Sequence, residues 1–123
     1  MNKKLEIKKD KRGRLIEIFK KPGFGQVFYS TSKPCVVRGN HYHKRKKEYF
    51  CVISGKAKIK LRNRKTNQIK EYYVFGDKPR LIEMKTGWTH NIKNIGRKKE
   101  MQLLVWVNEI FNPKNPDTFY EEA

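Results

Sequence analysis

The chain has little of the material from which membrane segments and disulfide frameworks are built. Two of its 123 residues are cysteine, and no apolar run approaches the roughly 20 residues that cross a bilayer. Cys35 follows a proline and Cys51 lies in an apolar run, which favours two buried free thiols in a reducing compartment. The start, Met1-Asn2-Lys3-Lys4, is not followed by an apolar stretch like that of a signal peptide. We therefore expect a cytoplasmic protein without a membrane span.

Negative charge is also scarce, with 12 acidic residues against 30 lysines and arginines and a net charge of +18. Such an excess attracts nucleic acid, anionic lipid and phosphorylated small molecules alike. The basic residues are scattered from Lys3 to Lys114, whereas nucleic-acid binders concentrate them on one helix, arm or sheet face. We expect no specific nucleic-acid partner. A phosphorylated substrate accounts for the sign of the charge, though not for its size.

A helical periodicity is missing until the end of the chain, and the pattern is one of short strands. Residues 56–62 alternate strictly between apolar and basic side chains, which predicts a strand with one buried face. Residues 48–54 and 101–107 are apolar on both faces and are expected to be central strands. Turn signals such as Pro22-Gly23 and Ser54-Gly55 separate the runs. The sequence predicts one all-β domain over residues 1–123, an antiparallel sandwich or barrel.

Three histidines and one glutamate form the most informative pattern. His41 and His43 are two residues apart, so in a strand their side chains point the same way. Glu48 follows after a basic turn, and His90 stands four residues before Asn94 in a second cluster. Imidazoles with one carboxylate suit a divalent transition metal with a coordination position left open. The alternative is three unrelated histidines on a polar surface, and the β-type context of both clusters favours the metal site.

These residues resemble the two motifs of the cupin superfamily, which implies a jelly-roll β-barrel. The patterns are Gly39-x-His41-x-His43-x4-Glu48-x6-Gly55 and Gly87-x2-His90-x3-Asn94. The second motif departs from the family, because Lys85 stands where cupins usually carry a proline. This change alters the turn but leaves His90 in place as the fourth ligand. The resemblance implies a metal site of His41, His43, Glu48 and His90.

Within the cupins, the chain resembles nucleotide-sugar epimerases and, over almost its whole length, the C-terminal domain of bifunctional capsular polysaccharide enzymes. The matching segments are Asp10-Lys11-Arg12-Gly13 with Leu15, Glu17 and Phe19, then Gln26-Val27-Phe28, Val37-Arg38-Gly39-Asn40-His41, and a tail over residues 108–123. The resemblance implies zinc-dependent C3-epimerisation of a UDP- or dTDP-linked 4-keto-6-deoxy sugar for surface polysaccharide. A G-x-x-G-x-x-G nucleotide-binding run is missing, so we expect a separate reductase to act on the product.

The same resemblance suggests roles for individual residues. His41 aligns with the catalytic base of metal-free epimerases, yet the cupin motif makes it a ligand, and we favour the ligand. Tyr42, Lys85 and Tyr49 are then weak candidates for the base. Arg38 matches an arginine that meets the diphosphate, with a plain surface charge as an equal alternative. Arg12 is expected to enter the partner's site in a homodimer that exchanges N-terminal strands (about residues 5–20).

Several interpretations stay open. A sugar-nucleotide 3,4-ketoisomerase shares the R-G-x-H-x-H pattern, and a non-catalytic cupin that binds sugar or metal fits the missing reductase domain. A small metal-dependent dioxygenase fits the ligands but neither the arginine signature nor the tail. Trp88 and Trp106 could stack on a sugar or a base, but core positions are more common for such rings. The ligand set also suits iron, manganese, nickel or cobalt, and only the resemblance points to zinc.

Overall fold

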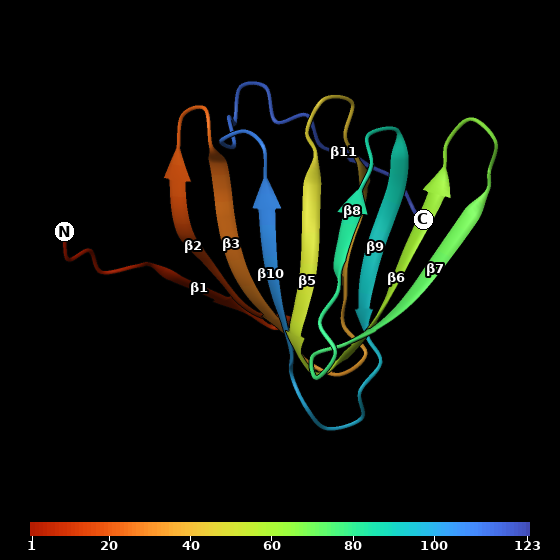
Figure 1. The fold of residues 1–123 in the computed structure, drawn as a ribbon, viewed down its shortest axis with the longest axis horizontal. Helices are drawn as coiled ribbons and strands as arrows, with labels where there is room; N and C mark the ends of the chain where they lie inside the picture. Colours follow the sequence, from red (N-terminus) through yellow and green to blue (C-terminus); the bar gives the residue numbers. More distant parts are fainter.

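The computed structural model describes residues 1–123 as eleven strands without a helix (Figure 1). No helix is therefore available that could cross a membrane. The strands are β1 (Ile7–Asp10), β2 (Gly13–Lys21), β3 (Gly25–Ser32), β4 (Val37–Tyr42), β5 (Glu48–Ser54), β6 (Lys56–Asn63), β7 (Ile69–Phe75), β8 (Leu81–Met84), β9 (Trp88–Asn94), β10 (Met101–Val107) and β11 (Phe119–Tyr120).

The strands form two sheets that face each other, and every pairing is antiparallel. The six-stranded sheet runs β1-β2-β3-β10-β5-β8, and the five-stranded sheet runs β11-β4-β9-β6-β7. Neighbours in a sheet are often distant in sequence: β10 lies between β3 and β5. This two-sheet barrel confirms the all-β antiparallel architecture expected from the sequence.

The core fills the space between the sheets and follows the alternation seen in the sequence. Along β6, Ala57, Ile59 and Leu61 are buried, while the lysines between them reach the outside. Phe50 and Val52 of β5 face them across the barrel as part of the same cluster of eleven buried apolar residues. Because each strand gives alternate side chains to the interior, the core is built from one face of each sheet.

The outer face of the six-stranded sheet is apolar as well, as the two-sided pattern of β5 and β10 suggested. Leu104 and Trp106 of β10 point outward and are paired in register with Cys51 and Tyr49 of β5. The Trp106 indole packs on the Tyr49 ring, with centroids 5.6 Å apart, and its Nε1 donates to the Phe24 carbonyl. Trp106 is thus a surface residue of this sheet.

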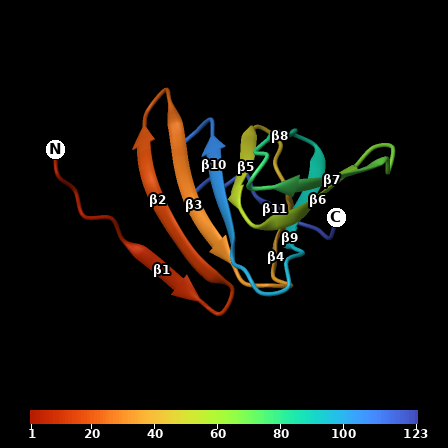
Figure 2. The same ribbon diagram turned by 60° about the horizontal axis from the view of Figure 1, so that its bottom comes forward.

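The N-terminal segment, expected as one strand, is divided into β1 and β2 by a tight turn. The Asp10 carboxylate accepts a hydrogen bond from the Arg12 backbone N–H at 2.8 Å and pairs with the guanidinium, which closes the turn. Gly13 follows with a φ of +148°, and a Cβ there would collide with the Thr31 carbonyl. All four residues of β1 are exposed, and the strand projects from the barrel (Figure 2).

Both cysteines are free, but the expectation that both are buried is wrong for Cys35. Cys35 lies in the turn between β3 and β4 with a φ of +69°, and its side chain is exposed. Its backbone N–H bonds to the Asn94 carbonyl, which fixes the backbone and leaves the thiol outside. Cys51 is half-buried on the outer face of β5.

Candidate metal centre

The four predicted ligands meet inside one end of the barrel. His41 lies near the end of β4 and is paired in register with His90 of β9. His43 follows in the turn after β4, and Glu48 is the first residue of β5 in the opposite sheet. One donor atom from each residue falls within 4.8 Å of all the others. The spacing of the motif therefore brings together groups from both sheets.

A β-bulge in β4 sets the direction of the residues around His41. The register with β9 shifts between Gly39 and His41, and Asn40 takes a left-handed φ of +56°. Without the bulge, Arg38 and His41 would lie on opposite faces, because they are three positions apart along the strand. With it, both side chains line the same interior pocket.

His43 and Glu48 form the contact that most directly requires a cation. The Nδ1 of His43 lies 2.6 Å from the Asp117 carbonyl oxygen, which can only accept, so Nδ1 carries a proton. The other ring nitrogen, Nε2, lies 2.5 Å from Glu48 Oε1. In a neutral ring this nitrogen is also an acceptor, so two acceptors face each other. A proton or a metal ion between them resolves the conflict.

The pKa values show how the metal-free site uses a proton. Burial by itself lowers the pKa of His43, but the hydrogen bond to Glu48 and its charge outweigh burial and raise it. Burial likewise acts to raise the pKa of Glu48, and the bond from His43 with the nearby imidazoles lowers it instead. Both shifts favour the charged pair of imidazolium and carboxylate when no ion is bound.

The other two histidines are neutral and ready to coordinate. Burial lowers the pKa of His41 to about 4 and that of His90 to about 3, against the attraction of the Glu48 charge. The His90 side chain is 1% exposed, and neither of its ring nitrogens has a hydrogen-bond partner. A buried polar group without a partner costs about 1–3 kcal/mol, which coordination of an ion would recover.

The residues present therefore fit a divalent metal ion. Three imidazoles and one carboxylate are a donor set that zinc and several other transition metals accept. The orphaned nitrogens of His90 and the opposed acceptors of His43 and Glu48 both gain partners if one ion sits among them. The donor set alone does not distinguish zinc from iron, manganese, nickel or cobalt.

A pocket of about 250 Å³ opens beside the ligands, between β3 and β10 on one side and β4 and β9 on the other. Arg38, at its edge, donates from Nε to the Ser32 hydroxyl and from Nη2 to the Thr31 carbonyl, both at 2.9 Å. Burial, and then the charge of Arg12, lower the pKa of Arg38, which has no carboxylate partner. The pocket is lined by Leu15, Phe28, Ser30, Arg38, Gly39, His41, Glu48, Phe50, Ile92, Leu103 and Val105.

The other sequence candidates lie outside this pocket. The Tyr42 ring stacks on Phe119 at 5.1 Å and lies 3.8 Å from the Arg64 guanidinium. It is on the opposite face of β4 from His41. Lys85 is exposed and lines a different hollow together with Trp88. Arg12 pairs with Asp10 at the turn between β1 and β2, with half its side chain exposed.

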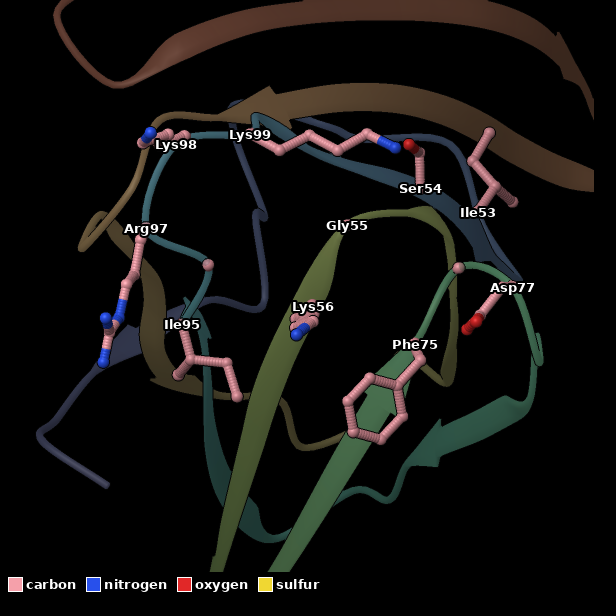
Figure 3. A pocket seen from close by; sticks show the side chains of 12 residues that line it. Ile53, Ser54, Gly55, Lys56, Phe75, Asp77, Ile95, Arg97, Lys98 and Lys99 are labelled. Carbon is pink, nitrogen blue, oxygen red and sulfur yellow. The ribbon is translucent and has the colours of Figure 1, made fainter.

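A larger cavity, about 810 Å³, lies at the opposite end of the barrel and contains none of the candidate site residues (Figure 3). It is bounded by the end of β5, the start of β6 and the loop over residues 95–99, which carries Arg97, Lys98 and Lys99. Glu48 begins β5, while Ile53 and Ser54 end it, so the two cavities are separated by the length of that strand. The larger of the two cavities is therefore not the one beside the ligands.

Sequence reasoning missed the contribution of Asp117. Its carbonyl contacts His43, and its carboxylate accepts hydrogen bonds from the backbone of the turn after His43. Asp117 is 74 positions from His43, and no spacing rule connects the two. The only available signal was the tail itself, which the cupin motifs do not require.

Comparison with known proteins agrees with the fold. The model of the family named polysaccharide biosynthesis C-terminal domain matches residues 8–119. The chain belongs to this family. The match includes all four ligands, the pocket and most of the tail.

Two curated proteins are similar to this chain in sequence. A Pseudomonas aeruginosa protein named UDP-2-acetamido-2,6-beta-L-arabino-hexul-4-ose reductase is 42% identical over 110 residues, covering 89% of this chain and 29% of that protein. The spore coat polysaccharide biosynthesis protein SpsL of Bacillus subtilis is 27% identical over 125 residues, covering 94% and 82%.

Solved structures place the chain among the cupins. The capsular polysaccharide assembling protein CapF from Staphylococcus aureus superposes with a TM-score of 0.94 at 43% identity, covering 99% of this chain and 34% of that one. An oxalate decarboxylase from Bacillus subtilis matches with a TM-score of 0.75 at 20% identity, covering 94% and 30%, which shows the shared barrel alone. The cupin fold expected from the two motifs is confirmed. The chain spans about a third of the length of CapF and of the Pseudomonas relative.

Proposed function

We propose that this domain catalyses the metal-dependent C3-epimerisation of a nucleotide-linked 4-keto-6-deoxy sugar, with UDP as the nucleotide, in surface polysaccharide biosynthesis. The observation that carries the proposal is the position of the ligand cluster. His41 and Glu48 line an apolar pocket that also contains the unpaired arginine Arg38. The likeness to CapF and to a relative named for a UDP-hexulose supports the substrate class.

The residues of this chain suit the chemistry of a ketone with an acidic neighbouring proton. When bound, a divalent ion supplies a Lewis acid for a carbonyl oxygen. The guanidinium of Arg38 is held by Ser32 and Thr31 and offers its remaining N–H groups to the diphosphate. The apolar walls, among them Phe28 and Phe50, exclude water from the reacting carbon.

We assign His41 to the metal rather than to the base, because its donor atom lies in the cluster with those of His43 and Glu48. Tyr42 and Lys85 stay secondary proposals for the proton carrier. Tyr42 would first have to leave its contacts with Phe119 and Arg64. Lys85 would have to turn from the hollow it lines.

Two partners complete the proposal. The product keeps its ketone, so a reductase must act on it afterwards. A second copy of the chain is the other partner: β1 projects from the barrel with all its residues exposed, a form suited to exchange between subunits. In such a homodimer Arg12 would approach the partner's pocket.

The decisive test uses a UDP-linked 4-keto-6-deoxy-N-acetylhexosamine in D₂O. Exchange of its C3 proton is monitored by NMR. We expect exchange with the metal-loaded protein and its loss after chelation. His43→Ala should lose bound metal and slow exchange by about 100-fold or more, since each 1.36 kcal/mol of lost stabilisation is a factor of ten. Lys98→Ala, in the distant cavity, serves as the matched control and should behave as wild type.

The outcomes separate the alternatives. Retained exchange in a metal-free His43→Ala protein would disprove the metal role. Exchange with a product whose ketone has moved to C3 would identify a 3,4-ketoisomerase, which shares the same first proton removal. No exchange under any loading, with the substrate intact, would leave a binding cupin without this activity.

A further inference from the structure

The C-terminal segment wraps the end of the barrel that holds the ligands. Its strand β11 pairs with the end of β4, with Tyr120 opposite His41 in the register. Farther back, Glu109 pairs with Arg45 at 2.7 Å in the turn between the ligands. The segment therefore contacts both pieces of chain that carry His41 and His43.

Asp117 makes the innermost of these contacts. Its carboxylate accepts hydrogen bonds from three successive backbone N–H groups, those of Lys44 at 3.0 Å and of Arg45 and Lys46 at 2.8 Å. The residue is 4% exposed and has a left-handed φ of +50°. Three bonds from one side chain fix the shape of the turn that follows His43.

The same residue also fixes the imidazole. Because the carboxylate is locked onto the turn, the Asp117 carbonyl is held 2.6 Å from His43 Nδ1. A carbonyl only accepts, so in the neutral ring the proton must be on Nδ1, and the lone pair is on Nε2, facing Glu48. Partners of this kind set which nitrogen of a ligating histidine binds the metal.

We propose that Asp117 is a positioning residue of the metal centre: it commits Nε2 of His43 to the ion by holding Nδ1–H on its own carbonyl. Asp117 is not itself among the four donors. The proposal rests on the metal-dependent function above for its consequence in catalysis. The hydrogen bond exists without an ion, and the tautomer of the neutral ring can be measured without one, so both can be tested separately.

The experiment compares wild type with Asp117→Ala, Asp117→Asn and the control Glu109→Gln. Asp117→Asn keeps one acceptor oxygen and the tolerance of a left-handed backbone, so it carries the test if the alanine variant does not fold. Glu109→Gln weakens a surface contact of the same segment that does not touch His43. Zinc affinity is measured by chelator competition, and the His43 tautomer by ¹H–¹⁵N ring correlations of the metal-free protein at alkaline pH, where the ring is neutral.

We expect zinc affinity to fall roughly 10–100-fold in Asp117→Ala, the usual effect of losing an outer partner of a ligand, and less in Asp117→Asn. The Nδ1–H form of His43 should give way to a mixture of tautomers in Asp117→Ala, while Glu109→Gln keeps both properties. Unchanged affinity together with an unchanged tautomer in both Asp117 variants would overturn the proposal. If wild type binds no zinc, the proposed function fails, and the tautomer measurement still decides the role of Asp117.

Discussion

At the scale of single residues, the structure explains which parts of the site could be read from the sequence. Alternation along a strand was enough to place His41 and His43 together, and the second motif supplied His90. Burial leaves both ring nitrogens of His90 without a hydrogen-bond partner, which no sequence pattern reports. The contact between His43 and Asp117 was not predictable, because it depends on how a distant segment returns to the barrel.

Replacing His90 by leucine tests whether its nitrogens are in fact orphaned. The metal-free His90→Leu protein should be more stable than wild type by about 1–3 kcal/mol, because two buried polar atoms without partners are removed from apolar surroundings. Urea unfolding in the presence of a chelator measures this difference. With zinc present the order should reverse, since only wild type gains stability from the ion. A loss of stability under chelation would mean that the imidazole has a partner in the metal-free protein.

At the scale of elements, strands were easier to predict than their irregularities. The alternation of residues 56–62 appears directly in β6, and the two-sided patterns appear in β5 and β10. The bulge in β4 has no such signature, although it decides that Arg38 faces the pocket. A strand pattern assumes that side chains alternate between the two faces, and a bulge interrupts this alternation.

Gly39→Ala tests the bulge. Gly39 has a φ of +96°, and an added Cβ would lie 2.9 Å from the His90 carbonyl oxygen. We expect a loss of about 1–3 kcal/mol in the free energy of unfolding and weaker zinc binding, because β4 must shift against the ligand strand. Gly23→Ala is the matched control: its φ is +83°, but nothing lies within 4 Å of the new Cβ. Equal effects of the two variants on zinc binding would contradict this account of the bulge.

At the scale of the whole molecule, the net charge of +18 limits how two copies can meet. The 30 lysines and arginines outnumber the 12 acidic residues, so approach of two copies is repulsive. The outer face of the six-stranded sheet has Leu104, Trp106, Tyr49 and Ile53 in place of charge. This face is where a second copy would bury apolar area at the least electrostatic cost.

Placing charge on that face tests whether it is a second contact of the proposed homodimer, beside the exchange of N-terminal strands. Leu104 is 37% exposed at the middle of β10, and Leu104→Arg should convert a dimer into a monomer in sedimentation velocity. Tyr73→Arg makes the same kind of change on the outer face of the other sheet, where Tyr73 of β7 is 56% exposed, and should leave the dimer intact. The reverse result would move the interface to the five-stranded sheet.

His43 Nε2 and Glu48 Oε1 lie 2.5 Å apart, so a metal ion that binds between them would replace a proton. Because the hydrogen bond to Glu48 and its charge raise the pKa of His43, a proton is held there more strongly than on a free imidazole, and below that pKa uptake of a metal must expel it. Calorimetry in buffers of different ionisation enthalpy would count that proton. Below the pKa of His43, each further unit of acidity then weakens metal uptake by about tenfold per expelled proton, and the proposed metal-dependent activity would fall with it.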